Sequence, residues 1–209
     1  MKNDLSTLYT IGYTSCSSPE EMITTLREHH IQALIDVRSV PYSAYYEQYD
    51  KENLRKILQK ANIHYGNFHN EFGARQENHA FYKNGRLDFD LFSHSQQFLS
   101  GMKRVEDGIH HGYCPVLMCA EKNPITCHRA IMIARKFKEA GYRVIHLLPD
   151  GDEKNHEELE RDLLNLYFPD REQISLFDAE GPQNDRERLQ KAYELQNDKI
   201  GFQEENLTA

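Results

Sequence analysis

Residues 119 to 130, CAEKNPITCHRA, concentrate side chains that could carry out chemistry. A cysteine thiolate is a strong nucleophile, a histidine or a glutamate can carry a proton, and an arginine can bind an anion. The candidate site residues in this stretch are Cys119, Glu121, Cys127, His128 and Arg129. Either cysteine could be the nucleophile, His128 or Glu121 the proton carrier, and Arg129 the substrate-binding residue.

The expected local structure makes one of these thiols reactive. The apolar run PVLMC (115–119) predicts a strand that Cys119 ends, and Thr126 is the expected N-cap of the next helix. Cys127 would then be the first helical residue, where the positive end of the helix dipole favours a thiolate. The cation of Arg129 is unfavourable at the same helix end unless an anionic ligand or a nearby carboxylate offsets it. We therefore expect a functional pocket there.

Two other interpretations of the same residues stay open. Cys119 and Cys127 could pack as small apolar residues, without any chemistry. Together with His128 they are also zinc-ligand types. Adjacent cysteine and histidine side chains usually point in different directions, however, and no fourth ligand is evident. We predict neither a metal nor a cofactor and keep a metal site as an alternative.

A second strand end adds a carboxylate and another cation. ALIDV (33–37) runs into IDVRSVP, so Asp36 and Arg38 lie two residues apart and on the same side of the chain. Burying a carboxylate without a partner is costly, which leaves two interpretations: the two residues pair with each other, or they serve a site. We predict Asp36 as the carboxylate that orients the catalytic groups and Arg38 as a substrate-binding residue.

The first strand, LYTIG (8–12), ends in hydroxyl groups. Tyr13, Thr14 and Ser15 follow Gly12 and precede a helix whose N-terminal N–H groups could hold an anion. We list all three as candidate substrate-binding residues. Hydroxyls in this position are more often simple helix caps.

Strands and helices alternate along the chain. The three strands above and RVIHLL (143–148) are short apolar runs, and between them lie helical patterns such as SPEEMITTLREHH, with Ser18 as N-cap and Pro19 at the first helical position. This order predicts an α/β fold, a three-layer α/β/α sandwich around a mostly parallel sheet, Rossmann-like or flavodoxin-like. Ligands of such sheets bind beyond the carboxyl ends of the strands, where all the candidate residues lie.

The chain divides into a core and a charged end. We predict one α/β domain over residues 1–177 and, over 178–209, a charged, solvent-facing helix with a flexible tail. Residues 69–88 show turn signals without a period and predict a long loop or lid.

Composition limits the classes of function. The chain has 209 residues and a formal net charge of -8, which disfavours non-specific binding to nucleic acid or to an anionic membrane. No stretch has the length and apolarity of a signal peptide or a spanning helix, so we expect a cytoplasmic protein. Four cysteines in such a compartment are expected to be reduced.

Four motifs together resemble a known family. YTIGYTS, LIDVRSVPYS, FGARQ and LMCAEKNPITCHRA, in this order, are similar to the bacterial and archaeal family called domain of unknown function 488. The resemblance implies a three-layer α/β fold and a site built from Asp36, Arg38 and the 119–129 segment. It implies no particular reaction.

A further motif points to a protein partner. QISLF (173–177) resembles the pentapeptide with which bacterial DNA-maintenance proteins dock on the sliding clamp, and five residues match easily by chance. The candidate partner-binding residues are Gln173, Leu176 and Phe177.

Our leading hypothesis is a cysteine-dependent hydrolase or transferase that acts on an anionic or nucleotide-like small substrate, with a possible link to DNA repair. The alternatives are a non-catalytic nucleotide-binding or clamp-docking adaptor and a metal-binding protein.

Overall fold

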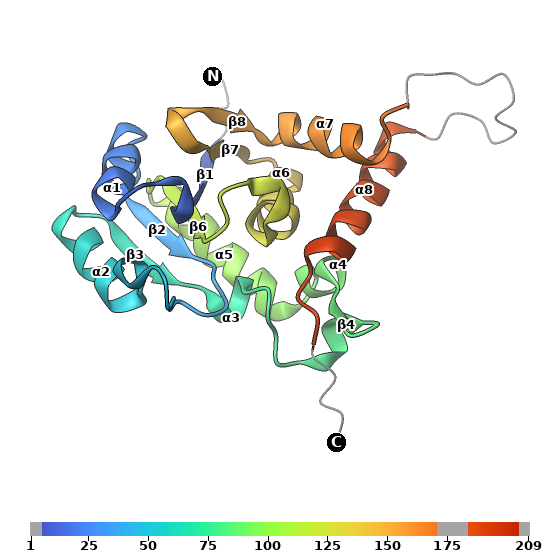
Figure 1. Ribbon diagram of the computed structural model, residues 1–209, viewed down its shortest axis with the longest axis horizontal. Coiled ribbons are helices and arrows are strands. Elements are labelled where there is room, and N and C mark those ends of the chain that lie inside the picture. Colours follow the sequence, from blue (N-terminus) through green and yellow to red (C-terminus); the bar gives the residue numbers. More distant parts are fainter. Residues whose placement is uncertain (1–5, 171–183, 205–209) are drawn as a thin grey trace, which may run out of the picture.

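A six-stranded sheet forms the centre of the computed structural model, which describes residues 6–170 and 184–204 (Figure 1). The strand order is β3-β2-β6-β1-β7-β8. The first five strands in this order pair in parallel, and β8 pairs antiparallel with β7 at one edge. The strands are β1 (Thr7–Gly12), β2 (Ala33–Asp36), β3 (His64–Asn67), β6 (Pro115–Cys119), β7 (Arg143–Leu147) and β8 (Glu153–Asn155).

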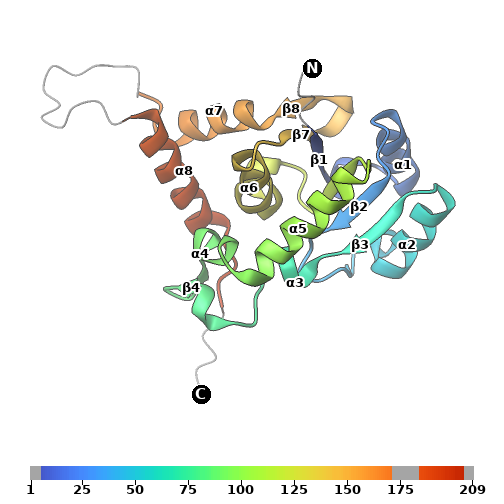
Figure 2. The ribbon, with the colours of Figure 1, turned by 180° about the vertical axis from the view of Figure 1, so that it is seen from behind.

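Helices cover both faces of this sheet. One face packs on α1 (Pro19–Glu28) and α2 (Lys51–Lys60), and the other on α5 (Gln96–His110), the π-helical turn η5 (Arg129–Ala134) with α6 (Arg135–Glu139), and α7 (His156–Tyr167). Figure 2, seen from behind, brings α5 in front of the sheet, while α1 and α2 lie on its far side. The predicted three-layer α/β/α fold is therefore confirmed.

The four predicted strands are present as β1, β2, β6 and β7, and the sequence missed the two edge strands. Every residue of β6 is buried, as the continuous apolar run required. By contrast β3 reads HYGN and β8 reads EKN, and neither has a fully buried residue. An edge strand contacts the core on one side only, so it lacks the apolar signature that identifies a central strand.

Helix α1 begins as its sequence indicates. The Ser18 side chain accepts a hydrogen bond from the Glu21 backbone N–H at 3.2 Å, and Pro19 is the first helical residue. Asp50 directly precedes α2, but its carboxylate accepts from the Ser43 N–H at 2.8 Å instead of capping the helix.

The segment 69–88 is more structured than the long loop predicted for it. It contains α3 (His69–Phe72), the 3-10 turn η3 (His79–Phe81) and the hairpin strands β4 (Tyr82–Lys83) and β5 (Arg86–Leu87). The helix α4 (Phe89–Ser93) follows it. Further 3-10 turns are η1 (Tyr13–Ser15), η2 (Glu47–Tyr49), η4 (Pro124–Thr126) and η6 (Pro149–Gly151).

A last helix, α8 (Asp185–Ile200), packs against the domain (Figure 1). The sequence predicted a solvent-facing helix, but its Ala192, Tyr193 and Gln196 are buried. Beyond it, residues 201–204 bond to the hairpin: the Leu87 N–H donates to the Phe202 carbonyl at 3.0 Å. The buried face of α8 is narrow, and the many charged residues of this helix made it hard to recognise in the sequence.

None of the helices within the described ranges is long and apolar enough to cross a membrane.

A buried chain of hydrogen bonds ties this helix to the sheet. His146 on β7 bonds Thr10 at 2.8 Å and His156 on α7 at 3.0 Å, and His156 bonds the Tyr193 hydroxyl at 2.9 Å. Tyr193 in turn donates to the Glu160 carboxylate at 3.1 Å. Because the Tyr193 hydroxyl gives its proton to Glu160, it accepts from His156 Nε2. His156 Nδ1 then accepts from His146 Nε2, and His146 Nδ1 accepts from the Thr10 hydroxyl. In this arrangement both imidazoles are neutral, as their lowered pKa values favour. Burial, and then the charge of Lys138, lowers the pKa of His156 to about 3.

This arrangement predicts a protein that loses stability in mild acid. Histidines of the unfolded chain take up protons below about pH 6.5, while His156 in the folded chain resists until about pH 3, so the free energy of unfolding falls as the pH drops through that window. We expect a loss of about 2 kcal/mol between pH 7 and pH 5 from His156 alone. Urea unfolding of His156→Gln at both pH values should show a shallower dependence. His110→Gln, at an exposed histidine, is the matched control, and an unchanged dependence in His156→Gln would contradict the mechanism.

Candidate functional site

The carboxyl ends of three adjacent strands meet around the sequence CAEKNPITCHRA. Cys119 at the end of β6 pairs in register with Gly12 of β1, and Met118 pairs with Asp36 of β2. Thr14 ties the ends together, since both its backbone N–H and its hydroxyl donate to the Ala120 carbonyl, at 3.3 and 2.6 Å. Polar residues far apart in the sequence thus lie beside one another.

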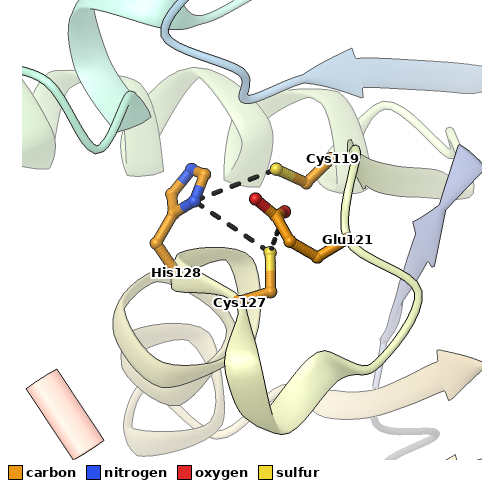
Figure 3. A group of neighbouring side chains, drawn as sticks. All are labelled: Cys119, Glu121, Cys127 and His128. Carbon is orange, nitrogen blue, oxygen red and sulfur yellow. Dashed lines mark hydrogen bonds between the residues drawn. The ribbon is translucent and has the colours of Figure 1, made fainter. Parts of the chain in front are cut away.

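Four reactive side chains form a compact cluster at this edge of the sheet (Figure 3). They are Cys119, Glu121, Cys127 and His128, whose thiol, carboxylate and imidazole atoms all lie within 4.8 Å of one another. His128 Nδ1 is 3.8 Å from Cys119 Sγ and 4.0 Å from Cys127 Sγ, and a hydrogen bond of 2.9 Å joins Cys127 Sγ to a Glu121 carboxylate oxygen. Cys119 and Cys127 are almost fully buried, whereas Glu121 reaches solvent. The structure thus brings together all but one of the candidates in the 119–129 stretch.

The start of the helix differs from the prediction. Residues Pro124–Thr126 form a 3-10 turn, so Thr126 does not cap the helix, and Cys127 has an extended backbone with φ -129° and ψ 135°. The Cys127 carbonyl accepts from the N–H groups of Ala130 and Ile131 at 3.0 and 3.1 Å, which makes Cys127 the residue that precedes the helix. Because Cys127 is extended and His128 is helical, their side chains can converge although they are sequence neighbours.

The hydrogen bonds of His128 define its protonation at one nitrogen. Its Nε2 lies 3.0 Å from the Val37 carbonyl oxygen, an acceptor only, so Nε2 carries a proton. Nδ1 is left to face the two sulfurs. Burial opposes a charge on this ring, but hydrogen bonding to Cys127 and the negative groups around it raise the pKa of His128.

The pKa values of the two cluster thiols shift in opposite directions. Burial, and then the neighbouring Cys127 and Glu121, raises the pKa of Cys119 well above its ordinary value. Burial also disfavours a Cys127 thiolate, but a hydrogen bond from Cys119 and the charges of Arg129 and His128 outweigh it, so the pKa of Cys127 falls well below its ordinary value. Burial and the adjacent Cys127 raise the pKa of Glu121. The negative charge of the cluster therefore resides on Cys127.

Arg129 is fully buried and holds the loop in place. Its Nη1 donates to the Glu121 carbonyl at 2.5 Å and its Nη2 to the Lys122 carbonyl at 3.3 Å. These carbonyls are the hydrogen-bond partners of the cation that we predicted as substrate-binding. Arg129 does not line the cavity beside the cluster.

Asp36 and Arg38 pair with each other behind the cluster. Arg38 donates from Nε and Nη2 to the two carboxylate oxygens of Asp36 at 2.9 and 2.7 Å, and Nη2 also donates to the Tyr49 carbonyl. The Tyr65 hydroxyl donates to the same carboxylate at 2.9 Å. Asp36 is completely buried and bonds none of the four cluster side chains, so it orients Arg38. Tyr65, on the edge strand β3, had no signal in the sequence.

Of the three candidate residues in the turn after β1, Tyr13 is the one that lines the cavity. Tyr13 lines the cavity and stacks on Tyr49 with ring centres 4.4 Å apart. Thr14 is engaged with the Ala120 carbonyl, and the buried Ser15 hydroxyl has no hydrogen-bond partner within the described part of the chain.

A cavity of about 390 Å³ opens beside the cluster. Cys119, Glu121 and His128 line one side of it, and Arg38 lines another. The sequence did not single out the remaining wall, which includes Arg75, Ile200 and Phe202. In the sequence, Arg75 was marked only by its place in the family motif FGARQ. Ile200 and Phe202 carried no such mark, because they reach the cavity through the packing of α8 and the segment after it.

The fold and this edge cluster define an α/β protein with a Cys-Glu-Cys-His site at the carboxyl end of a parallel sheet. The chain belongs to the family described as domain of unknown function DUF488, whose model matches residues 18–135. No curated protein and no solved structure matches it. Gln173, Leu176 and Phe177 lie outside the described residues, so clamp docking and the link to DNA repair stay predictions from the sequence.

The close approach of β1 to the loop predicts a sensitive position. A Cβ added at Gly12 would lie 1.9 Å from the Glu121 carbonyl oxygen, so Gly12→Ala must displace the loop that Arg129 holds. We expect it to lower the free energy of unfolding by about 1 to 3 kcal/mol. Gly108→Ala is the matched control, because a Cβ there meets nothing within 4 Å. Thermal unfolding of both variants checks this, and equal melting temperatures would refute the steric argument.

Proposed function

We propose that this protein is a cysteine-dependent hydrolase or transferase that acts on a small anionic substrate in the cavity. One observation carries the proposal: Cys119, Glu121 and His128 line a cavity, and Cys127 lies within 4.8 Å of all three without lining it. A nucleophile, a base and an acid within hydrogen-bonding reach are the parts that covalent catalysis requires.

The arrangement supports a division of labour between the thiols. Cys119 lines the cavity, whereas Cys127 does not. Because the Cys119 thiol hydrogen-bonds the Cys127 thiolate, Cys127 can accept its proton as the Cys119 sulfur forms a bond to the substrate. The leaving group departs with a proton from the Glu121 carboxyl, whose raised pKa favours the protonated form. Water or a second substrate then takes the bound group from sulfur, and the thiol is restored.

The proposal predicts selective alkylation of one thiol. Brief treatment with iodoacetamide at pH 7, followed by peptide mapping, should modify Cys119 about tenfold or more faster than Cys16. Cys16 is the internal reference because it is more exposed than Cys119 and because its pKa is likewise raised, by burial and by Glu21, to about 11. Cys16 lies outside the cluster and so lacks the neighbouring thiolate that would accept its proton. Cys127→Ala should slow the modification of Cys119, since the proton acceptor is lost.

Cys114→Ala is the matched control, because this half-buried cysteine lies outside the cluster. Reaction of Cys119 and Cys127 only after denaturation, both with and without a chelator, would refute thiol catalysis. So would an unchanged rate of Cys119 modification in Cys127→Ala.

A second candidate function, a zinc site at the same cluster, is favoured by the ligand set. Zinc prefers thiolate, imidazole and carboxylate ligands, and atoms bound to one ion lie roughly 3.3 to 3.8 Å apart in a tetrahedron. The 3.8 and 4.0 Å separations of His128 Nδ1 from the two sulfurs approach this spacing. Glu121 supplies the fourth ligand that the sequence did not reveal. The hydrogen bond from His128 to the Val37 carbonyl is also the support that metal-binding histidines usually have.

Elemental analysis of the purified protein distinguishes the two candidates. A zinc protein should contain about one equivalent of zinc, lose it in Cys127→Ser and keep it in Cys114→Ser. Its cluster thiols should resist iodoacetamide until a chelator removes the metal. Absence of metal, together with no thiolate-to-cobalt absorption on addition of Co²⁺, would eliminate this candidate and leave the free-thiol mechanism.

A further inference from the structure

The cavity contains a buried cation with unused hydrogen-bonding capacity. Arg38 is only 5% exposed, and its Nη1 has no hydrogen-bond partner among the residues that the structure describes. Its other two guanidinium nitrogens are bonded to Asp36 and Tyr49. A buried donor without a partner is costly, so a ligand acceptor in the cavity that Arg38 lines would remove a cost already present in the fold.

A second arginine lines the same cavity, without a counterion among the described residues. Arg75 is exposed, and within the described ranges no carboxylate pairs with its guanidinium. The ring of Phe202 covers one face of that group, with Cζ 4.7 Å from the ring centre. Cation–π packing of this kind leaves the N–H edges available for a bidentate contact with an oxyanion.

One hydrogen bond brings the two arginines to the same place. The Arg75 backbone N–H donates to the side chain of Ser39 at 2.9 Å, and Ser39 directly follows Arg38 in the chain. The Asp36 carboxylate neutralises Arg38, so the guanidinium of Arg75 gives this part of the cavity a net positive charge. A phosphate group matches both the charge and the planar donors.

An exposed aromatic ring lines the same cavity. Tyr42 lines the cavity and is 52% exposed, and its hydroxyl donates to Glu52 at 3.1 Å, which limits the motion of the ring. Aromatic rings held in this way stack on nucleobases. The volume of about 390 Å³ lies near the lower end of small-molecule sites, which fits a ligand with one ring system and one phosphate.

We propose that the cavity binds a nucleoside monophosphate, with its phosphate on Arg38 and Arg75 and its base on Tyr42. This inference rests on the proposed function in one respect, that the cavity is the ligand-binding site. It holds whether the cluster acts through free thiols or binds zinc. Phe202 positions Arg75 from outside the family match of residues 18–135. The segment after α8 therefore contributes to ligand binding in this chain.

Calorimetric titration of the full-length protein with AMP, GMP, CMP and UMP tests the proposal, with adenosine and inorganic phosphate as the two partial ligands. At least one monophosphate should bind, and more tightly than either partial ligand. Arg75→Gln should weaken that binding about tenfold or more, and Tyr42→Ala about fivefold or more while leaving the affinity for inorganic phosphate unchanged.

Arg55→Gln is the matched control, since Arg55 is an exposed arginine on α2 away from the cavity. Arg75 and Tyr42 are exposed, so neither substitution should prevent folding, and circular dichroism verifies this. The proposal is overturned if none of the four nucleotides binds, if inorganic phosphate binds as tightly as they do, or if Arg75→Gln binds like the wild type. The alkylation and metal measurements need no ligand, so failure of the proposed function and failure of this inference are separately visible.

Discussion

The buried guanidinium of Arg129 is the contact on which the site depends. By donating to the carbonyls of Glu121 and Lys122, it fixes the loop between β6 and the following helix, and Gly12 allows β1 to approach the same loop. These two carbonyls offset in part a charge that would otherwise be unfavourable both in the core and at a helix start, although the buried Nε has no hydrogen-bond partner among the described residues. With the loop held, the Glu121 side chain has to extend over the two sulfurs.

Within the cluster, each group sets the charge of the others. Three acidic groups and one imidazole cannot all ionise at such close range, so charge on Cys127 raises the pKa of Cys119, Glu121 and His128. The same compactness suits proton transfer to and from a substrate and the binding of a cation. Thiol catalysis and zinc binding are therefore alternative proposals that rest on the same arrangement of four side chains. In the first, protons neutralise the sulfurs, and in the second, a metal ion does.

The residues outside the family match complete the cavity. The match covers residues 18–135, which include the reactive cluster, Arg38 and Arg75. Ile200 and Phe202 line the opposite wall because α8 buries Ala192 and Tyr193 against the core, and because residues 201–204 bond to the hairpin of β4 and β5. The reactive groups therefore belong to the shared domain, while part of the wall that a ligand meets comes from this chain's own C-terminal segment.

Sequence alone determined the central strands, the main helices and the identity of the reactive segment, because apolar periodicity and helix caps such as Ser18 are local signals. It could not determine the edge strands β3 and β8, whose residues are polar, or the buried face of the charged helix α8. It also could not determine the hydrogen-bond partners of Arg129 or the position of the Glu121 side chain. Only the tertiary structure decided these points, since the partners of Arg129 are carbonyl oxygens, which every residue carries, and since the convergence of Cys127 and His128 depends on backbone angles that no side-chain pattern encodes.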